Sequence, residues 1–368
     1  MANQVLFNCF EREPPELRSE LQAAAKSVLD SNWWILGNYV KQFEESFSRY
    51  IGVTQTIGVA NGLDAIEISL RSLGIGHGDE VITTSMTAFA TVLAIYRCGA
   101  TPVFADVQIG DACLDLGSVE RCIGPHTKAI IPVHLYGQAL RLDKLAALCA
   151  DKNLFLIEDC AQAHGASFYS QKVGSFGDLA AWSFYPTKNL GAVGDAGAIT
   201  TNSQSLAQKC RSLRNYGQTD RYTHEFQGLN SRLDELQAAL LCKKLPYLDR
   251  WTSARRLVAY SYWDKIDNPY VQLLDKPLDR HSHVHHLFVV KVSDRQSFQS
   301  HMSVNGVQTL IHYPIPSHLQ KAISTFRIDP NGLTNCELLA TQCVSLPVHP
   351  FLIEDEIDCV VSAVNSYR

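Results

Sequence analysis

The chain has 368 residues, of which 46% are hydrophobic and 19% are charged, and its formal net charge is −5 at pH 7. This length suits two domains that share a cleft, and the low charge content is typical of a compact enzyme with much buried surface. The slightly acidic balance, without any basic stretch, argues against nucleic acid as the main partner.

The N-terminus has no basic start followed by an apolar core, and no apolar run reaches the length of about 18 residues that a transmembrane helix needs. We therefore expect neither a signal peptide nor a membrane span. The eleven cysteines are scattered and form no C-x-x-C pair. We expect no disulfide framework and no metal site, and a reducing cytoplasm fits best.

Short apolar strands alternate with helical patterns between about residues 50 and 200. Strands are predicted at Thr56–Val59, Glu80–Thr83, Thr101–Ala105, Ala129–Val133 and Phe155–Glu158. Helices are predicted where Leu63, Ile66, Leu70 and Leu73 recur at spacings of three and four, and over Leu142–Ala150. This alternation predicts an α/β fold with a mainly parallel sheet between layers of helices.

The pattern changes near Leu245-Pro246-Tyr247. A helix over Leu233–Lys244 precedes this point, a basic helix over Arg250–Tyr262 follows it, and a strand is predicted at Leu287–Val292. We therefore predict a large domain over residues 1–245 and a smaller C-terminal α+β domain over residues 246–368.

A glycine turn joins the first strand to its helix in the segment Gly58-Val59-Ala60-Asn61-Gly62-Leu63-Asp64-Ala65. The first amides of a helix carry a partial positive charge that suits phosphate, and Gly62 lets the backbone approach a ligand closely. Many such turns bind nothing, so both interpretations stay open.

Two acids end the strand in Leu154-Phe155-Leu156-Ile157-Glu158-Asp159. Ligands of open parallel sheets bind beyond the carboxyl ends of the strands, and a carboxylate there can keep a ring nitrogen protonated. The alternative is that Glu158 and Asp159 cap a following helix.

A single lysine, Lys188, lies between two apolar stretches in Ser183-Phe184-Tyr185-Pro186-Thr187-Lys188-Asn189-Leu190-Gly191. An arbitrary lysine is usually a solvated surface residue. Here the apolar flanks and Pro186 indicate a partly desolvated amine, which loses its proton more easily and suits Schiff-base chemistry. Ser183 is placed to donate to a phosphate.

The segment Gly228-Leu229-Asn230-Ser231-Arg232-Leu233-Asp234-Glu235-Leu236-Gln237-Ala238-Ala239 leads into a helix. Asn230 or Ser231 could simply cap that helix, and Arg232 could pair with surface acids.

These four elements, in this order, resemble the DegT/DnrJ/EryC1/StrS family of sugar aminotransferases, and the resemblance covers nearly the whole chain. Five further motifs belong to it, namely Trp34–Gly37, Pro132–Gln138, Leu213–Gly217, Ile311–Pro314 and Ser345–Pro350. The resemblance implies a fold type I enzyme that uses pyridoxal 5'-phosphate and works as a homodimer with shared active sites.

Carried over residue by residue, the resemblance implies that Lys188 holds the cofactor as a Schiff base and moves the proton. Asp159 is expected to pair with the pyridine nitrogen, and Gln162 to lie near the ring hydroxyl. The phosphate is expected to be held by Gly62, Leu63 and Ser183 of one subunit and by Asn230 of the partner subunit.

One segment departs from the family pattern. Many relatives carry an aromatic residue that stacks on the cofactor within a T-Y-x-A-T motif, where this chain has Thr87-Ala88-Phe89-Ala90-Thr91. Ala88 therefore stands at the stacking position, and Phe89 is not assigned as a cofactor contact. Trp34, where a tyrosine is common, is a milder change.

The expected substrates are a nucleotide-linked keto-sugar and L-glutamate. Candidates for the sugar nucleotide are Arg221 and Tyr222 from the partner subunit, with His312 and Tyr313 approaching from the small domain. Either Arg255 or Arg256 could assist, although both could also only solvate a helix face.

The expected reaction converts a dTDP-3-keto-6-deoxyhexose to the dTDP-3-amino-3,6-dideoxyhexose, because the segments Asn61–Ala65, Tyr185–Asn189 and Ile311–Pro316 resemble the C3-acting branch of the family. The alternatives are a C4 aminotransferase on a dTDP-4-keto-6-deoxyhexose and a C3 aminotransferase on a UDP-linked keto-uronic sugar. Two further alternatives stay open, namely a non-catalytic regulatory protein that binds the cofactor and a sugar-nucleotide binding module that binds no cofactor. Dehydratases of the family carry histidine at the position of Lys188, which favours transamination here.

Overall fold

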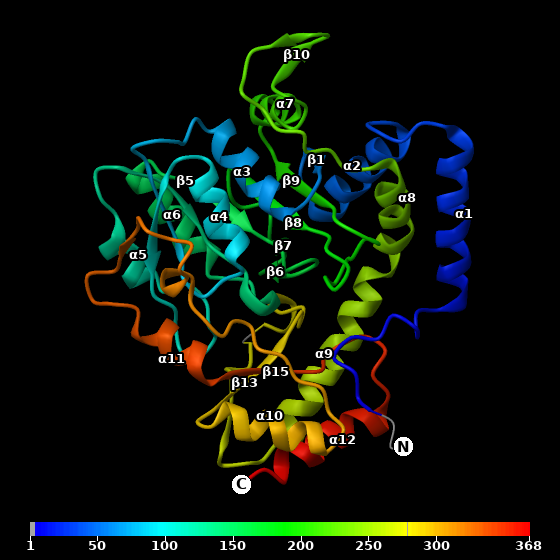
Figure 1. Cartoon of the computed structure of the whole chain (residues 1–368), viewed down its shortest axis with the longest axis vertical. Helices are drawn as coiled ribbons and strands as arrows, with labels where there is room; N and C mark the ends of the chain where they lie inside the picture. The colour runs from blue at the N-terminus through cyan, green and yellow to red at the C-terminus, as the bar shows by residue number, and fades with distance from the viewer. Residues whose placement is uncertain (1–3, 278) are drawn as a thin grey trace.

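An eight-stranded sheet forms the centre of the computed structural model, which describes residues 4–277 and 279–368 (Figure 1). Its strands are arranged in the order β1-β9-β8-β5-β4-β2-β3-β14, and all neighbours are parallel except the two pairs made by β9. Their bounds are β1 Gln55–Val59, β9 Gly197–Thr201, β8 Leu179–Ser183, β5 Phe155–Asp159, β4 Thr127–Ile131, β2 Glu80–Thr84, β3 Thr101–Ala105 and β14 Arg327–Ile328. The predicted α/β fold with a mainly parallel sheet is confirmed.

Helices cover both faces of this sheet because successive strand residues point to opposite sides. Ile157 of β5 packs in the cluster that includes helices α3, α4 and α7, whereas its neighbour Leu156 packs on the opposite face. The helices in contact with the sheet are α2 Asn38–Ile51, α3 Gly62–Ser72, α4 Phe89–Arg97, α5 Leu116–Cys122, α6 Leu142–Lys152 and α7 Gln204–Leu213. Helices α1 Pro15–Ser31 and α8 Glu235–Lys244 pack against each other at the right of Figure 1.

A second, three-stranded antiparallel sheet lies below the first in Figure 1, with the order β12-β13-β15. Its core packs against helices α9, α10 and α12. The bounds are β12 Val271–Leu273, β13 Phe288–Val292, β15 Cys343–Leu346, α9 Leu248–Lys265, α10 Arg295–Val304 and α12 Glu354–Asn365. The other strands of the described residues form two short hairpins, β6 Ser167–Phe168 with β7 Gln171–Lys172 and β10 Gln218–Asp220 with β11 Thr223–His224.

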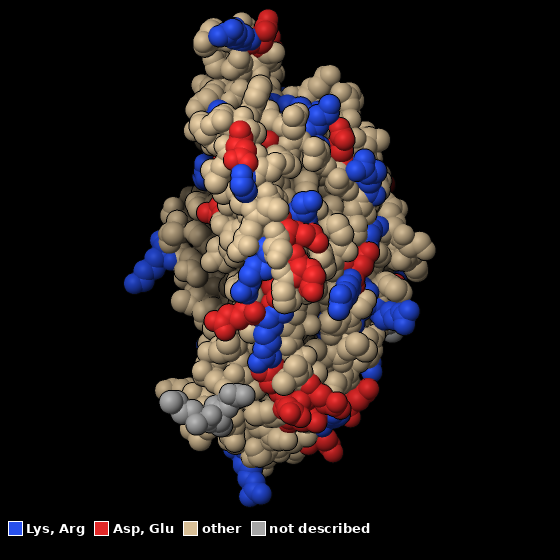
Figure 2. Space-filling model, turned by 90° about the vertical axis from the view of Figure 1, so that its right-hand side faces the viewer, with Lys and Arg blue, Asp and Glu red and all other residues tan. Residues whose placement is uncertain are grey.

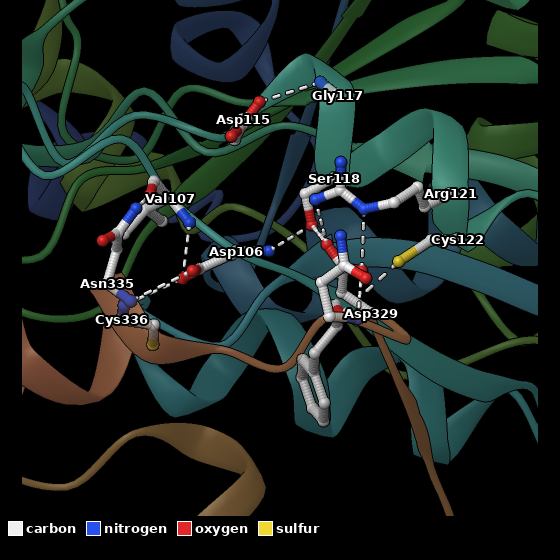
Figure 3. Close-up of polar contacts among 12 residues, drawn as sticks. Asp106, Val107, Asp115, Gly117, Ser118, Arg121, Cys122, Asp329, Asn335 and Cys336 are labelled. Atoms are coloured by element: carbon white, nitrogen blue, oxygen red, sulfur yellow. Dashed lines mark hydrogen bonds and ion pairs between the residues drawn. The ribbon is translucent and has the colours of Figure 1, made fainter.

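A segment near the C-terminus returns to the large sheet before the chain enters β15. Strand β14 pairs in parallel with β3, and helix α11 Thr334–Gln342 follows it. Figure 3 shows how two acids hold this segment. Asp106, which directly follows β3, accepts the amides of Asn335 and Cys336 at 3.0 and 2.8 Å and so caps α11 from a remote part of the chain.

Asp329 makes the second attachment shown in Figure 3. Its buried carboxylate accepts from Arg121 Nε at 3.0 Å and Nη2 at 2.6 Å, and also from the Ser118 hydroxyl. The predicted division at residues 245 and 246 stays a prediction, and β14 lies on the large sheet although it follows that point.

Most predicted elements lie within two residues of those observed, and two differences have clear causes. The strand predicted at Ala129–Val133 ends at Ile131 because Pro132 has no amide to donate to the ladder. The helix predicted from Leu233 begins at Glu235, since Leu233 is buried in the core beside α2 instead.

Both capping alternatives are wrong. Helix α8 has Asp234 at its N-cap rather than Asn230 or Ser231, and Ser231 accepts the Ala60 amide at 3.1 Å. Strand β5 is followed by turns and then by strand β6, so Glu158 and Asp159 cap no helix.

On the face shown in Figure 2, Lys and Arg side chains lie among Asp and Glu side chains, and acidic side chains gather in its lower part, without a continuous basic surface among the residues described there. Over the described ranges, the structure also contains no helix that is both long enough and apolar enough to cross a membrane.

Candidate active site

Three chain segments meet at one edge of the large sheet. The parallel neighbours β5 and β8 end there at Asp159 and Ser183, and β1 runs in the same direction through its pairing with β9. The N-terminus of α3 at Gly62 therefore lies beside both strand ends. This edge is where open α/β sheets bind their ligands.

Gly62 and Ser183 approach each other closely at this edge. A Cβ atom added at Gly62 would lie 2.7 Å from the Ser183 Cβ atom and 3.2 Å from its Cα atom. The Asn61 side chain caps α3 by accepting the Asp64 amide at 2.8 Å, which leaves the amides of Gly62 and Leu63 free of that cap. Two amides with a partial positive charge and one hydroxyl thus converge, as an anion site requires.

Asp159 is a buried carboxylate at the end of β5. It accepts the Thr91 hydroxyl at 2.8 Å and the Ala161 amide at 3.1 Å. Burial raises the pKa of Asp159, while these hydrogen bonds and the nearby Lys188 act in the opposite direction. Because burial of a charge is costly, such a carboxylate is stabilised by a further cationic partner.

Lys188 follows β8 in a turn where its amide donates to the Tyr185 carbonyl at 2.8 Å. The residue is partly accessible, yet burial of its amine lowers its pKa to about 8, against the attraction of Asp159. A larger fraction of the amine is therefore neutral near neutral pH than for an ordinary lysine, which suits nucleophilic chemistry.

Gln162 connects the sheet edge to the segment that carries His312 and Tyr313. Its Oε1 atom accepts the Tyr136 amide at 2.6 Å, and its Nε2 atom donates to the Tyr313 hydroxyl at 3.0 Å. Burial raises the pKa of Tyr313 to about 12, and the nearby Asp159 adds to this shift. Tyr313 is therefore a neutral hydroxyl inside the site.

Buried neutral histidines surround the lysine. Burial and the charge of Lys188 lower the pKa of His312 to about 4 and that of His164 to about 3. His312 shares a hydrogen bond of 2.8 Å with the Ser345 hydroxyl. His286 lies 3.2 Å from Asn189 Oδ1, which links the lysine turn to the three-stranded sheet.

The structure does not bring every predicted residue to this edge. Arg221 and Tyr222 lie in the β10–β11 hairpin, which projects at the top of Figure 1, and Tyr222 is 80% exposed. The Arg221 guanidinium lies 5.3 Å from the centre of the Tyr222 ring. Asn230 is also exposed and lines a surface pocket of about 330 Å³ with Ala60 and Asp195. One subunit alone therefore leaves these three side chains outside the site.

A model of the DegT/DnrJ/EryC1/StrS aminotransferase family matches residues 15–365. The chain belongs to this family. A dTDP-3-amino-3,6-dideoxy-alpha-D-galactopyranose transaminase of Aneurinibacillus thermoaerophilus is 47% identical over 350 residues, covering 95% of this chain and 96% of that protein. A pleiotropic regulatory protein of Geobacillus stearothermophilus is 41% identical, covering 96% of this chain and 95% of that protein. The solved structure of DesV from S. venezuelae in complex with a ketimine intermediate has a TM-score of 0.95 and 40% identity, covering 100% of this chain and 99% of that one.

Enzymes of the DegT/DnrJ/EryC1/StrS family use pyridoxal phosphate, and the residues at this edge fit that cofactor. The Gly62 position has no room for a side chain beside Ser183, which matches a cradle for phosphate. The buried Asp159 carboxylate needs a cation, which a protonated pyridine nitrogen supplies. The Lys188 amine, with its lowered pKa, lies close enough to interact with that same carboxylate.

One buried cluster near the site is structural. His134, Glu158 and Cys160 offer ligand atoms within 4.8 Å of one another. The Glu158 oxygens, however, already accept the amides of Gly174, Phe176 and Gly177 at 2.8 to 2.9 Å and face His134 at 3.1 Å. Glu158 thus fixes the loop before β8 next to Asp159, and its coordination needs are met by the protein.

One contributor to the site, Thr91, was missed from the sequence, and the surroundings of another candidate, Arg255, differ from those expected. Thr91 lies in the Thr87–Thr91 segment, which drew attention only for its missing aromatic residue. A threonine in the first turn of α4 becomes a signal only once β5 is known to lie beside that helix. Arg255 was expected on a solvated helix face or near the diphosphate, but it is only 6% exposed.

Proposed function

We propose that this family member transfers an amino group to C3 of a dTDP-linked 3-keto-6-deoxyhexose, with L-glutamate as the donor. The observation that carries the proposal is the Lys188 amine near the buried Asp159 carboxylate, at the sheet edge that also holds the Gly62–Ser183 cradle. The relative from A. thermoaerophilus is named as a transaminase of dTDP-3-amino-3,6-dideoxy-alpha-D-galactopyranose, which supports the sugar and the position of amination.

Pyridoxal phosphate, when bound, supplies an electron-withdrawing ring that stabilises negative charge on the carbon bearing the amine. We assign to Lys188 the covalent attachment of the cofactor and, once its amine is free, the movement of the proton from the α-carbon of the donor. Its depressed pKa lets the amine accept a proton from carbon and release it again near neutral pH.

The negative charge of Asp159 would hold a proton on the ring nitrogen of the cofactor, and Thr91 orients the carboxylate for this task. Gln162 is fixed by Tyr136 and Tyr313, so its amide would be held ready for the ring hydroxyl. The amides of Gly62 and Leu63, with the Ser183 hydroxyl, would bind the phosphate.

A homodimer with shared sites completes this assignment. Exposed apolar side chains gather where α1 leads into α2, with Leu29, Trp33 and Trp34 exposed by 63%, 63% and 57%. Such a patch is typical of a protein interface. We infer that the partner's Asn230 reaches the phosphate, and that the partner's Arg221 and Tyr222 meet the substrate diphosphate. His312 and Tyr313 approach the sugar from the same subunit.

A regulatory function without turnover is the second candidate, because one relative of 41% identity carries that description. The complete set of Lys188, Asp159 and Gln162 favours catalysis.

All eleven cysteines are free thiols, which supports the reducing cytoplasm as the place of action.

The deciding experiment incubates the purified protein and L-glutamate with dTDP-linked 3-keto and 4-keto sugars and a UDP-linked 3-keto-uronic sugar. We expect 2-oxoglutarate to form with the dTDP-3-keto sugar and nitrogen to appear at C3 by NMR. Nitrogen at C4, or turnover of the UDP sugar alone, would show that the proposed substrate is wrong. No turnover with any sugar would favour the regulatory candidate. An Arg221→Ala variant with an unchanged KM for the sugar nucleotide would remove that contact from the proposal.

A further inference from the structure

Arg255 lies on α9 as a buried cation without an acidic partner. Its Nη1 atom donates to the carbonyls of His285, at 3.3 Å, and Val348. Its Nε atom is buried and has no hydrogen-bond partner among the described residues. Burial lowers the pKa of Arg255 to about 10, and no carboxylate contributes in the opposite direction.

An unpaired guanidinium in the interior is expensive, because the charge has lost its hydration without gaining a counter-ion. Arginine also carries a rigid fork of donors that matches a carboxylate, and two neutral carbonyls use only part of it. The side chain is therefore built for an anion that the chain itself does not provide.

Arg255 lines a small cavity that also reaches the lysine turn. The cavity has a volume of about 40 Å³, and its walls include Thr187, Lys188 and Asn189. A second buried cation in its wall, Lys244, is already paired with Glu13 at 3.3 Å, and the Lys188 amine interacts with Asp159. The uncompensated positive charge of the cavity therefore belongs to Arg255.

The size of the cavity limits the anion. A buried water needs roughly 10–15 Å³ by the same kind of measure, so the space corresponds to about three waters. A carboxylate group matches this volume more closely than a nucleotide diphosphate does. The geometry therefore favours a carboxylate at Arg255 over the diphosphate contact that its sequence position suggested.

We propose that Arg255 binds a carboxylate of the amino donor and so positions the donor amine at Lys188. The inference rests on the proposed function, since transamination requires a donor amino acid to reach the same lysine as the sugar. It assigns separate contacts to the two substrates, with a carboxylate of the donor in the Arg255 cavity and the sugar nucleotide on the open side.

The test compares Arg255→Gln with Arg255→Lys and with a matched control, Arg250→Gln. Arg250 is an exposed arginine on the same helix, α9, and does not line this cavity. Binding of 2-oxoglutarate is measured by calorimetry, and the half-reactions with L-glutamate and with the amino-sugar nucleotide are followed separately by absorbance.

We expect Arg255→Gln to weaken 2-oxoglutarate binding and the apparent affinity for L-glutamate about 30- to 100-fold, with the sugar half-reaction changed less than about threefold. Arg255→Lys should weaken both affinities by about tenfold, between wild type and Arg255→Gln, because lysine keeps the charge but lacks the fork of donors. Wild-type affinity for both dicarboxylates in a folded Arg255→Gln protein would overturn the proposal, as would equal losses in both half-reactions.

A crystal structure of the wild-type protein with 2-oxoglutarate covers the case in which the variants do not fold. A carboxylate within hydrogen-bond distance of the Arg255 guanidinium supports the proposal, and a carboxylate bound elsewhere overturns it. The two proposals fail separately. Turnover of a keto-sugar with unaltered donor affinity in Arg255→Gln removes only this inference, whereas dicarboxylate binding at Arg255 without any sugar turnover removes only the proposed function.

Discussion

The Thr91 hydroxyl donates a hydrogen bond of 2.8 Å to Asp159 Oδ2, across 68 positions of sequence. It fixes the one carboxylate whose charge the proposed chemistry uses. Since an amide cannot hold a proton on the ring nitrogen as a carboxylate does, we expect Asp159→Asn to lower kcat by about 10²–10³-fold while the protein still binds cofactor.

The control for this substitution is Asp151→Asn on the exposed end of α6, where the acid pairs only with Lys152. Absorbance of bound cofactor and steady-state turnover are measured on both variants. Near-normal kcat in Asp159→Asn would refute its role.

The pKa of Lys188 leads to a pH prediction. Burial lowers this pKa to about 8, so the fraction of neutral amine, the form that reacts with the cofactor aldehyde, increases as the pH rises through about 8. The rate of reconstitution of the cofactor-free protein should therefore increase up to about pH 8 and then level off. An unperturbed lysine would continue to gain rate to about pH 10.

Stopped-flow absorbance measures the reconstitution rate, and borohydride reduction followed by peptide mapping identifies the attached lysine. Lys188→Ala should lose almost all turnover. Attachment at any other lysine contradicts the assignment.

The close approach of Gly62 and Ser183 predicts weaker cofactor binding in Gly62→Ala. The new methyl group would lie 2.7 Å from the Ser183 Cβ atom, so the strand end or the helix must shift by several tenths of an ångström. We expect the dissociation constant for pyridoxal phosphate to rise about 10- to 100-fold, as overpacking costs about 1–3 kcal/mol.

Gly76→Ala is the matched control, because its added Cβ atom would meet only the Cys98 carbonyl at an ordinary 3.4 Å. Equilibrium dialysis with pyridoxal phosphate measures the affinity of both variants. Equal affinities would show that this cradle does not hold the phosphate.

Shared active sites predict complementation between two inactive variants. If the partner's Asn230 completes each phosphate site, a hybrid of Lys188→Ala and Asn230→Ala subunits contains one site with neither substitution. Mixed subunits should recover up to about one quarter of wild-type activity after random exchange into dimers, half of which are hybrids with one intact site of two. Activity is followed by formation of 2-oxoglutarate, and a fully active monomer in sedimentation would contradict the prediction.

Asp329 predicts a loss of stability in acid. Hydrogen bonds from Arg121 lower its pKa to about 2, below its value in the unfolded chain. The stabilisation is therefore present above about pH 4 and is lost as the pH falls from about 4 to about 2. Asp329→Asn should destabilise the protein by about 1–2 kcal/mol at pH 7, because exposure of Arg121 to solvent screens the pair.

Chemical unfolding at pH 7 and pH 3 measures this effect, again with Asp151→Asn as the control. The difference between wild type and Asp329→Asn should shrink at the lower pH. A constant difference would show that the hydrogen bonds, rather than the charge, carry the contribution.

Local patterns predicted five of the eight strands of the large sheet, because these strands alternate with recognisable helical patterns. β3 matches its predicted bounds, and β1 begins one residue earlier than predicted. Strands β8 and β9 were identified only as apolar stretches that flank Lys188. Strand β14 was not predicted, since its two residues, Arg327 and Ile328, are both exposed and carry no apolar pattern. The identity of the family and its cofactor follows from motifs whose residues sit at strand ends.

Contacts between distant segments could not be predicted. The burial of Arg255 depends on α9 packing beneath the lysine turn, and a charged side chain at helical spacing gives no sign of that. The hydrogen bond between Gln162 and Tyr313 requires the segment after β13 to return across the sheet edge. Such relationships are set by tertiary packing, which a single sequence does not display.

The return of the chain to β14 adds a covalent connection between the two sheets. The polypeptide passes between them through α8 and α9 on the right of Figure 1 and through the segment with β14 and α11 on the left. It also connects them near the N-terminus, where Val5 pairs with Val307 before α1 packs against α8. All of these connections, rather than a single hinge segment, would have to deform if the sheets moved relative to each other, and Asp106 and Asp329 hold one of them in place.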